Sequence, residues 1–217
     1  MFESKLNDAI VCIGCSFTHG VSENKALDNW PYYLYKRLKG KTRVVNMALG
    51  GCSIMHSAYQ LEYIHKNGIK PKFIFFQVTN PYRLTLRTSP IKEKDFELQQ
   101  VDEDFYMTGV DHVVTNSTGS MKSNWVKNYY VQRDPDYDVL WSTEHNAVLH
   151  YITDMLQDYK HFMYSQEEYS EFKPYVKRWL RDDIMPLLFH DQSIVDKGDH
   201  LSSHALSVQA KLLAKFL

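Results

Sequence analysis

Two short segments at opposite ends of the chain carry residue types that can perform acyl transfer. Residues 10–20 read Ile-Val-Cys-Ile-Gly-Cys-Ser-Phe-Thr-His-Gly, so Ser16 follows a short apolar run and lies between Gly14 and Gly20. Near the other end, His200 lies within Asp-Lys-Gly-Asp-His-Leu-Ser, just before a segment with helical apolar spacing. A serine hydroxyl is an effective nucleophile when a base within hydrogen-bonding distance takes its proton. The two segments therefore predict Ser16 as nucleophile and His200 as its general base, close together in space.

The elements that must bring these residues together can be predicted from apolar patterning and from helix start and stop residues. Apolar runs short enough for buried strands alternate along the chain with segments of helical spacing, and this alternation predicts a three-layer α/β/α sandwich around a parallel sheet. The expected strands are 9–13, 43–47, 73–78, 161–164 and 185–189; the expected helices are 30–40, 54–66, 139–159, 168–181 and 203–216, the last with Ser202 as its N-cap.

We expect a single domain over residues 1–217, with residues 82–136 forming an insertion or lid after the third strand. This segment loses clear periodicity, and so long an irregular segment in a compact domain is usually functional. In an open parallel sheet, the loops that follow the strands converge on one edge. Three such loops carry Ser16, Gly51 and Asn80, and we expect the backbone amides of the first two and the side-chain amide of Asn80 to stabilise an oxyanion.

These residues resemble the SGNH hydrolase superfamily, also called GDSL esterases and lipases. The first block of that family, Gly-Asp-Ser with a downstream glycine, is similar to residues 14–20, in a Gly-Cys-Ser form that looks like short uncharacterised members, some of them phage-encoded. The second block, an asparagine followed five residues later by the oxyanion glycine, is similar to Asn46 and Gly51. The histidine of the last block, before the terminal helix, corresponds to His200.

The resemblance implies a flavodoxin-like α/β/α fold and hydrolysis of carboxylic esters, often acetyl groups on carbohydrates, through an acyl-enzyme on Ser16. The third block of the family, Gly-x-Asn-Asp, is represented by Val-Thr-Asn-Pro at 78–81, so Gln77 and Thr79 are alternatives to Asn80. Cys15 replaces the aspartate of the first block, which is tolerable if that aspartate only braces the turn.

The residue that orients the histidine has two candidates. Lys197 occupies the position three before His200 where the family has an aspartate, so Asp196 or Asp199 must take that role, unless the pair works as a dyad. We prefer Asp196, because adjacent side chains in an extended segment tend to point apart.

Other functions remain open at this level. Ser16, Thr18 and Gly20 in the first loop of a flavodoxin-like sheet could hold a phosphate, which would make the chain a non-catalytic nucleotide- or glycan-binding module or an inactive hydrolase fold. That reading leaves His200 unexplained, and the loop lacks a Walker lysine. Cys15 paired with His200 is an alternative nucleophile.

Composition narrows the partners and the compartment. The formal net charge of -1 gives no electrostatic argument for nucleic acid or membrane, so the expected partner is a small-molecule or carbohydrate ester. We expect no cofactor and no metal, because the Cys-x-x-Cys pair at 12–15 has no second pair. Three cysteines and no visible signal peptide favour a soluble cytoplasmic protein, in the host cytoplasm or a virion if it is phage-encoded.

Overall fold

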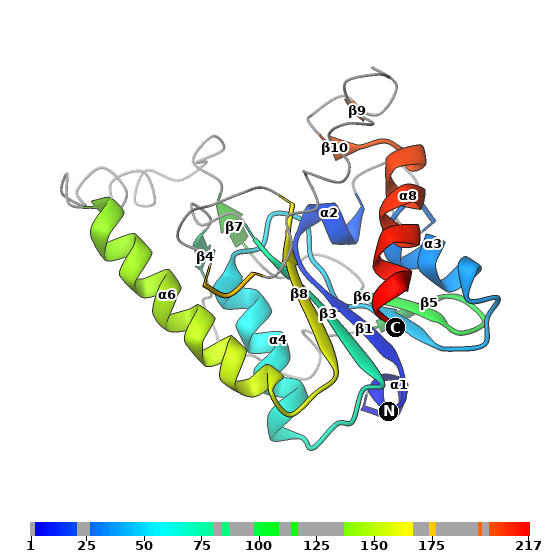
Figure 1. Ribbon diagram of the computed structural model, residues 1–217, viewed down its shortest axis with the longest axis horizontal. Helices are drawn as coiled ribbons and strands as arrows, with labels where there is room; N and C mark the ends of the chain where they lie inside the picture. The colour runs from blue at the N-terminus through cyan, green and yellow to red at the C-terminus, as the bar shows by residue number, and fades with distance from the viewer. Residues whose placement is uncertain are drawn as a thin grey trace.

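A six-stranded sheet forms the centre of the protein (Figure 1). The computed structural model describes residues 3–20, 27–79, 84–86, 98–108, 114–116, 137–166, 174–176, 195–196 and 200–217. The strand order is β5-β6-β2-β1-β3-β8, and all neighbouring strands are parallel except β5, which runs antiparallel to β6. The strands are β1 (Ile10–Ile13), β2 (Val44–Asn46), β3 (Phe73–Val78), β5 (Leu98–Asp102), β6 (Phe105–Thr108) and β8 (His161–Ser165).

Helices cover both faces of this sheet, which confirms the expected α/β/α architecture. In β1, Val11 and Ile13 belong to one apolar core, whereas Ile10 and Cys12 belong to another on the opposite face. The first core is closed by α4 (Ile54–Lys66) and α6 (Tyr137–Leu156), and the second by α3 (Trp30–Arg37) and α8 (Ser203–Leu213). Because β1 is buried along its whole length, its sequence reads as a continuous apolar run.

Side-chain caps set the starts of the two helices on the α8 face. Asn29 precedes α3 and its Oδ1 accepts a hydrogen bond from the backbone amide of Tyr32 at 2.9 Å, with Pro31 in the first turn. Ser202 precedes α8 and accepts from the amide of Ala205 at 3.4 Å. Both helix starts, including the Ser202 cap of α8, agree with the sequence-based expectation. Helix α8 continues into a short 3-10 turn at Ala214–Phe216.

Part of the segment expected to be an irregular insertion belongs instead to the central sheet. Strands β5 and β6 form a hairpin, and β6 pairs with β2 through the register Val44 to Phe105 and Asn46 to Met107. Elsewhere in this segment, β4 (Leu84–Leu86) pairs antiparallel with β7 (Val114–Asn116). Whether residues 82–136 act as a lid stays a prediction.

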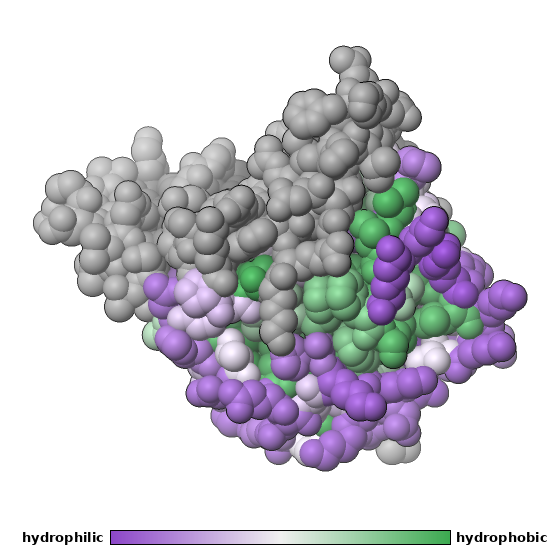
Figure 2. All heavy atoms as spheres, in the orientation of Figure 1, coloured by the Kyte–Doolittle hydropathy of each residue, from purple (hydrophilic) through white to green (hydrophobic). Residues whose placement is uncertain are grey.

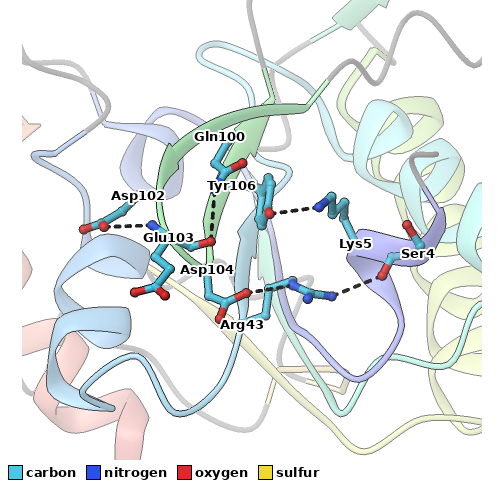
Figure 3. A network of polar contacts seen from close by, with 8 residues as sticks. All are labelled: Ser4, Lys5, Arg43, Gln100, Asp102, Glu103, Asp104 and Tyr106. Carbon is cyan, nitrogen blue, oxygen red and sulfur yellow. Dashed lines mark hydrogen bonds and ion pairs between the residues drawn. The ribbon is translucent and has the colours of Figure 1, made fainter.

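Polar contacts join the β5–β6 hairpin to β2 and to the start of the chain (Figure 3). Arg43 donates to Asp104 Oδ1 at 3.3 Å and to the Ser4 carbonyl in α1 (Glu3–Leu6) at 3.1 Å. Lys5 Nζ lies 3.0 Å from the Tyr106 hydroxyl. These contacts, together with the pairing of β6 with β2 and the burial of Phe105, hold the segment in the sheet.

The expected strand 185–189 lies outside the described residues, as does the expected helix 168–181 apart from 174–176, which lie in a turn. Within the described part of the chain, no helix is long and apolar enough to cross a bilayer. Figure 2 shows hydrophilic residues covering the end of the molecule near the N-terminus, where the parallel strands begin.

Candidate active site

Ser16 lies at the carboxyl end of the central strand, as the sequence predicts. Strand β1 ends at Ile13, the chain bends through Gly14 and Cys15, and Ser16 opens the one-turn helix α2 (Ser16–His19). The turn closes at Gly20, whose φ of 92° and ψ of 146° are accessible essentially to glycine alone. The serine is 6% exposed and lies at the edge of the sheet where the parallel strands end.

Gly14 is required because the turn packs directly against β3. A Cβ at this position would lie 2.6 Å from Gln77 Oε1 and 2.7 Å from Thr18 Oγ1, well inside contact distance. The first glycine of the motif is therefore explained by close approach of the backbone to a neighbouring strand.

A buried hydrogen-bond network holds the turn from below. Gln77 Oε1 accepts from the Cys15 amide at 3.3 Å and from the Thr18 hydroxyl at 2.6 Å. The same hydroxyl lies 3.2 Å from the indole nitrogen of Trp30 and 3.2 Å from the hydroxyl of Tyr164. The helix α2 is thereby tied to β3, β8 and α3.

The loop after β2 is bonded to the same turn. Asn46 donates through Nδ2 to the Thr18 carbonyl at 2.9 Å, and its Oδ1 accepts from the Ala48 amide at 3.1 Å. The Cys52 thiol donates to the Gly14 carbonyl at 3.2 Å. Between these contacts, Gly51 adopts a φ of 73°. Asn46 and Gly51, the two residues that resemble the second family block, are thus brought beside the serine turn.

The segment that contains His200 forms part of a short antiparallel strand pair. Strands β9 (Val195–Asp196) and β10 (His200–Leu201) pair so that Asp196 lies directly opposite His200. Figure 1 shows β10 and α2 both toward the end of the molecule where the parallel strands finish. Asn80 and Asp199, two of the predicted site residues, lie outside the described residues.

Comparisons with known proteins give little beyond this geometry. No protein-family model matches the chain, and no curated protein matches it. Among solved structures, the chain is similar to a member of the lipolytic protein G-D-S-L family from Veillonella parvula DSM 2008. The identity is 13%, the match covers 94% of this chain and 96% of that one, and the TM-score is 0.43. A likeness of this size does not assign the chain to that family.

The cysteines lie inside the fold. Cys12, Cys15 and Cys52 are free thiols and all are buried, and burial raises the pKa of the Cys12 thiol well above its ordinary value. Across the described residues, no group of three or more histidine, cysteine, aspartate or glutamate side chains could hold a metal ion.

Sequence reasoning missed the network under the serine. Gln77, an alternative to Asn80 in the sequence analysis, accepts through its carbonyl oxygen from the Cys15 amide and the Thr18 hydroxyl. The available signal was its position: Gln77 is the one polar residue in the otherwise apolar strand Phe73–Val78. A buried polar side chain in a central strand needs hydrogen-bond partners. Gln77 finds them in the serine turn, in the Cys15 amide and the Thr18 hydroxyl. The Thr79 hydroxyl, also buried, makes no hydrogen bond among the described residues.

Proposed function

We propose that this protein is a serine ester hydrolase that forms an acyl-enzyme on Ser16. The proposed substrate is a carboxylic ester of a short acyl group, such as an acetyl group on a carbohydrate. The observation that carries the proposal is the serine turn at the end of β1, bonded to the Asn46–Gly51 loop through Asn46 and Cys52. This loop and the serine turn lie at the carboxyl ends of β2 and β1, where parallel α/β sheets bind their ligands.

In the proposed reaction, Ser16 Oγ attacks the ester carbonyl carbon while His200 accepts the serine proton. The bond from that carbon to the leaving oxygen then breaks, and His200 returns the proton to the departing alcohol. A water molecule next attacks the acyl-enzyme, again giving its proton to His200, and the acid leaves as the proton returns to Ser16. Atoms and protons balance, and the enzyme ends in its starting state.

Two sets of groups support these steps in the proposal. The amides of Ser16 and Gly51, with the Asn80 side chain, would donate to the oxyanion, where each donor is worth roughly 10²- to 10³-fold in rate. Asp196 would orient His200. Its support is the β9–β10 register, since directly opposite residues in an antiparallel pair have Cβ atoms about 4.5–5.5 Å apart. Asp199 remains the alternative.

The test is covalent labelling by a fluorophosphonate together with hydrolysis of 4-nitrophenyl acetate. We expect the wild-type protein to be labelled once and to hydrolyse the ester, and Ser16→Ala to lose both activities. Ser4→Ala, which changes an exposed serine in α1 at the opposite end of β1, should label and hydrolyse at the wild-type rate.

Three outcomes would contradict the proposal. Full hydrolysis by Ser16→Ala would remove this residue from the mechanism. Activity that survives in Ser16→Ala but disappears in Cys15→Ala would assign the nucleophile to Cys15. A folded wild-type protein that neither labels nor hydrolyses esters would favour the non-catalytic binding module.

A further inference from the structure

We infer that Gln77 and Thr18 are positioning residues, which hold the Ser16 turn in its reactive geometry through a buried and fully directed hydrogen-bond network. The inference rests on the proposed function for its kinetic consequence. Neither side chain is expected to touch the substrate, because both are buried below the turn, Gln77 at 1% and Thr18 at 0% exposure.

The direction of every hydrogen bond at Thr18 follows from the donors and acceptors present. A threonine hydroxyl has one proton and two acceptor lone pairs. The backbone amide of Cys15 can only donate, so the Gln77 atom that faces it is the carbonyl oxygen, and Thr18 must give its proton to that same oxygen. The indole of Trp30 can only donate, so Thr18 accepts from it.

Tyr164 completes this arrangement. The single proton of Thr18 is already used, so at 3.2 Å the tyrosine hydroxyl must donate to the second lone pair. Burial raises the pKa of Tyr164 well above its ordinary value, so the hydroxyl keeps the proton that this role needs. Thr18 thus uses its full capacity of one donated and two accepted bonds, and its hydroxyl has one consistent arrangement.

The side chain that precedes α2 does not cap this short helix. Cys15 is the N-cap of α2 and makes no side-chain cap, although this is the position where the resembled family has an aspartate. Gln77 reaches the Cys15 amide from the neighbouring strand, and the missing Cβ of Gly14 gives it the space to do so. A four-residue helix is too short to hold its shape alone.

The hydrogen-bond network around Thr18 is surrounded by packed aromatic side chains of the core. Trp30 packs edge-on against Phe75 at 5.5 Å and Tyr164 at 6.3 Å between ring centroids, and all three rings are fully buried. The network is therefore anchored on β3, β8 and α3, which belong to the core. A catalytic group held by packed elements keeps its position within the narrow limits that nucleophilic attack requires.

The experiment compares near-isosteric substitutions that remove or keep the hydrogen bonds. Thr18→Val and Gln77→Leu remove them, whereas Thr18→Ser keeps the hydroxyl. We expect Thr18→Val and Gln77→Leu to lower kcat and the rate constant of fluorophosphonate labelling about 10- to 100-fold. KM should change less than about threefold, because the lost contact does not involve substrate. Thr18→Ser should recover most of the wild-type rate.

A matched control separates positioning from general destabilisation. Thr153 in α6, on the opposite face of the sheet, donates its hydroxyl to the Leu149 carbonyl at 2.7 Å. Thr153→Val makes the same chemical change there and should leave labelling per folded molecule unchanged. Amide hydrogen exchange supplies a readout that needs no activity: residues 15–19 should exchange faster in Gln77→Leu, while the amides of α6 keep their protection.

The outcomes distinguish this inference from the proposed function. Wild-type rates for folded Thr18→Val and Gln77→Leu, in a protein whose Ser16 does label, would overturn the positioning role and leave the hydrolase proposal intact. A wild-type protein that does not label at all would overturn the hydrolase proposal, and unchanged exchange at residues 15–19 would then also overturn the bracing. If Gln77→Leu fails to fold, Thr18→Val against Thr18→Ser decides the question.

Discussion

Gly14 shows, at the scale of single residues, how closely the serine turn lies against its neighbour. Its backbone conformation requires no glycine, but the space beside it is filled by the side chains of Gln77 and Thr18. In the next loop, Gly50 has no atom within 4 Å of the place where a Cβ would stand. These two glycines have different reasons to be present, although they look alike in the sequence.

Gly14→Ala is therefore expected to destabilise the protein by about 1–3 kcal/mol, the usual cost of adding a methyl group to a filled interior. The free energy of unfolding from urea titration measures this. Gly50→Ala is the matched control and should stay within about 0.5 kcal/mol of wild type. Equal stabilities for the two variants would mean that β3 does not lie against the turn as described.

The β5–β6 hairpin shows, at the scale of elements, how charged residues can fix a strand pair. Lys36 Nζ lies 2.7 Å from Asp102 Oδ2, and the Glu103 amide donates to Asp102 Oδ1 at 2.8 Å. These contacts, that with Lys36 first, lower the pKa of Asp102 below its ordinary value. The ion pair joins α3 to the end of β5, near the register shift between Gln100 and Asp102.

The pH dependence of stability follows from the direction of that shift. A carboxyl group whose pKa is lower in the folded state stabilises the fold above its unfolded pKa of about 3.9, and this contribution is lost as the pH falls through the folded pKa. We expect Asp102→Asn to be less stable than wild type at pH 7. The difference should shrink below about pH 4.

Urea titrations of both proteins from pH 7 down to pH 2.5 measure this effect. Lys36→Gln should reproduce much of the change, because it removes the main cause of the lowered pKa. A constant difference between wild type and Asp102→Asn over the whole range would show that the ion pair has no part in stability.

Much of the fold can be predicted at this scale, because its main elements carry local signals. The apolar runs of β1 and β3, the Asn29 and Ser202 caps and the helical spacing after Ser53 all correspond to observed elements. Strand β6 gives no comparable signal: four residues follow a polar turn, and their partner β2 is far away in the sequence. Pairing of that kind is decided by tertiary contacts.

The candidate site follows the same division. The position of Ser16 at the end of a strand could be predicted because apolar, glycine and serine spacing is local. Asn46 and Gly51 are expected near it from the family resemblance, and the roles of all three residues stay predictions. The support from Gln77, Tyr164 and Trp30 could not be predicted, since which buried side chains meet across three elements depends on packing. The polar residue in an apolar strand was the one visible sign.

At the scale of the whole molecule, the last helix brings the C-terminal part of the chain against the N-terminal part. Helix α8 follows the histidine segment and packs beside α3, which follows the serine turn (Figure 1). Just beyond α8, Phe216 stacks on Phe162 of β8, with ring centroids 3.8 Å apart and planes within 17°. The face of the sheet beneath the serine turn is thus closed by the C-terminal segment.

Phe216→Ala should lower the free energy of unfolding by about 1–2 kcal/mol, because it exposes a partly buried ring and the surface under it. Its neighbour Leu217, which is 48% exposed, is the control, and Leu217→Ala should be nearly neutral. Urea unfolding compares the two variants. Similar small effects would mean that the C-terminal turn does not dock on β8.

The strand order has a consequence for how this protein can diversify. From β1 the chain crosses by α3 to β2 on one side, then by α4 to β3 on the other, so the winding direction reverses at β1. Helix α3, which follows β1, and helix α6, which precedes β8, lie on opposite faces of the sheet. In open α/β sheets, ligands bind outside the carboxyl ends of the strands at such a reversal. Under the proposed function, the topological switch point therefore sets the location of the active site. Substitutions in the surrounding loops can change the ligand while the location of the site stays the same.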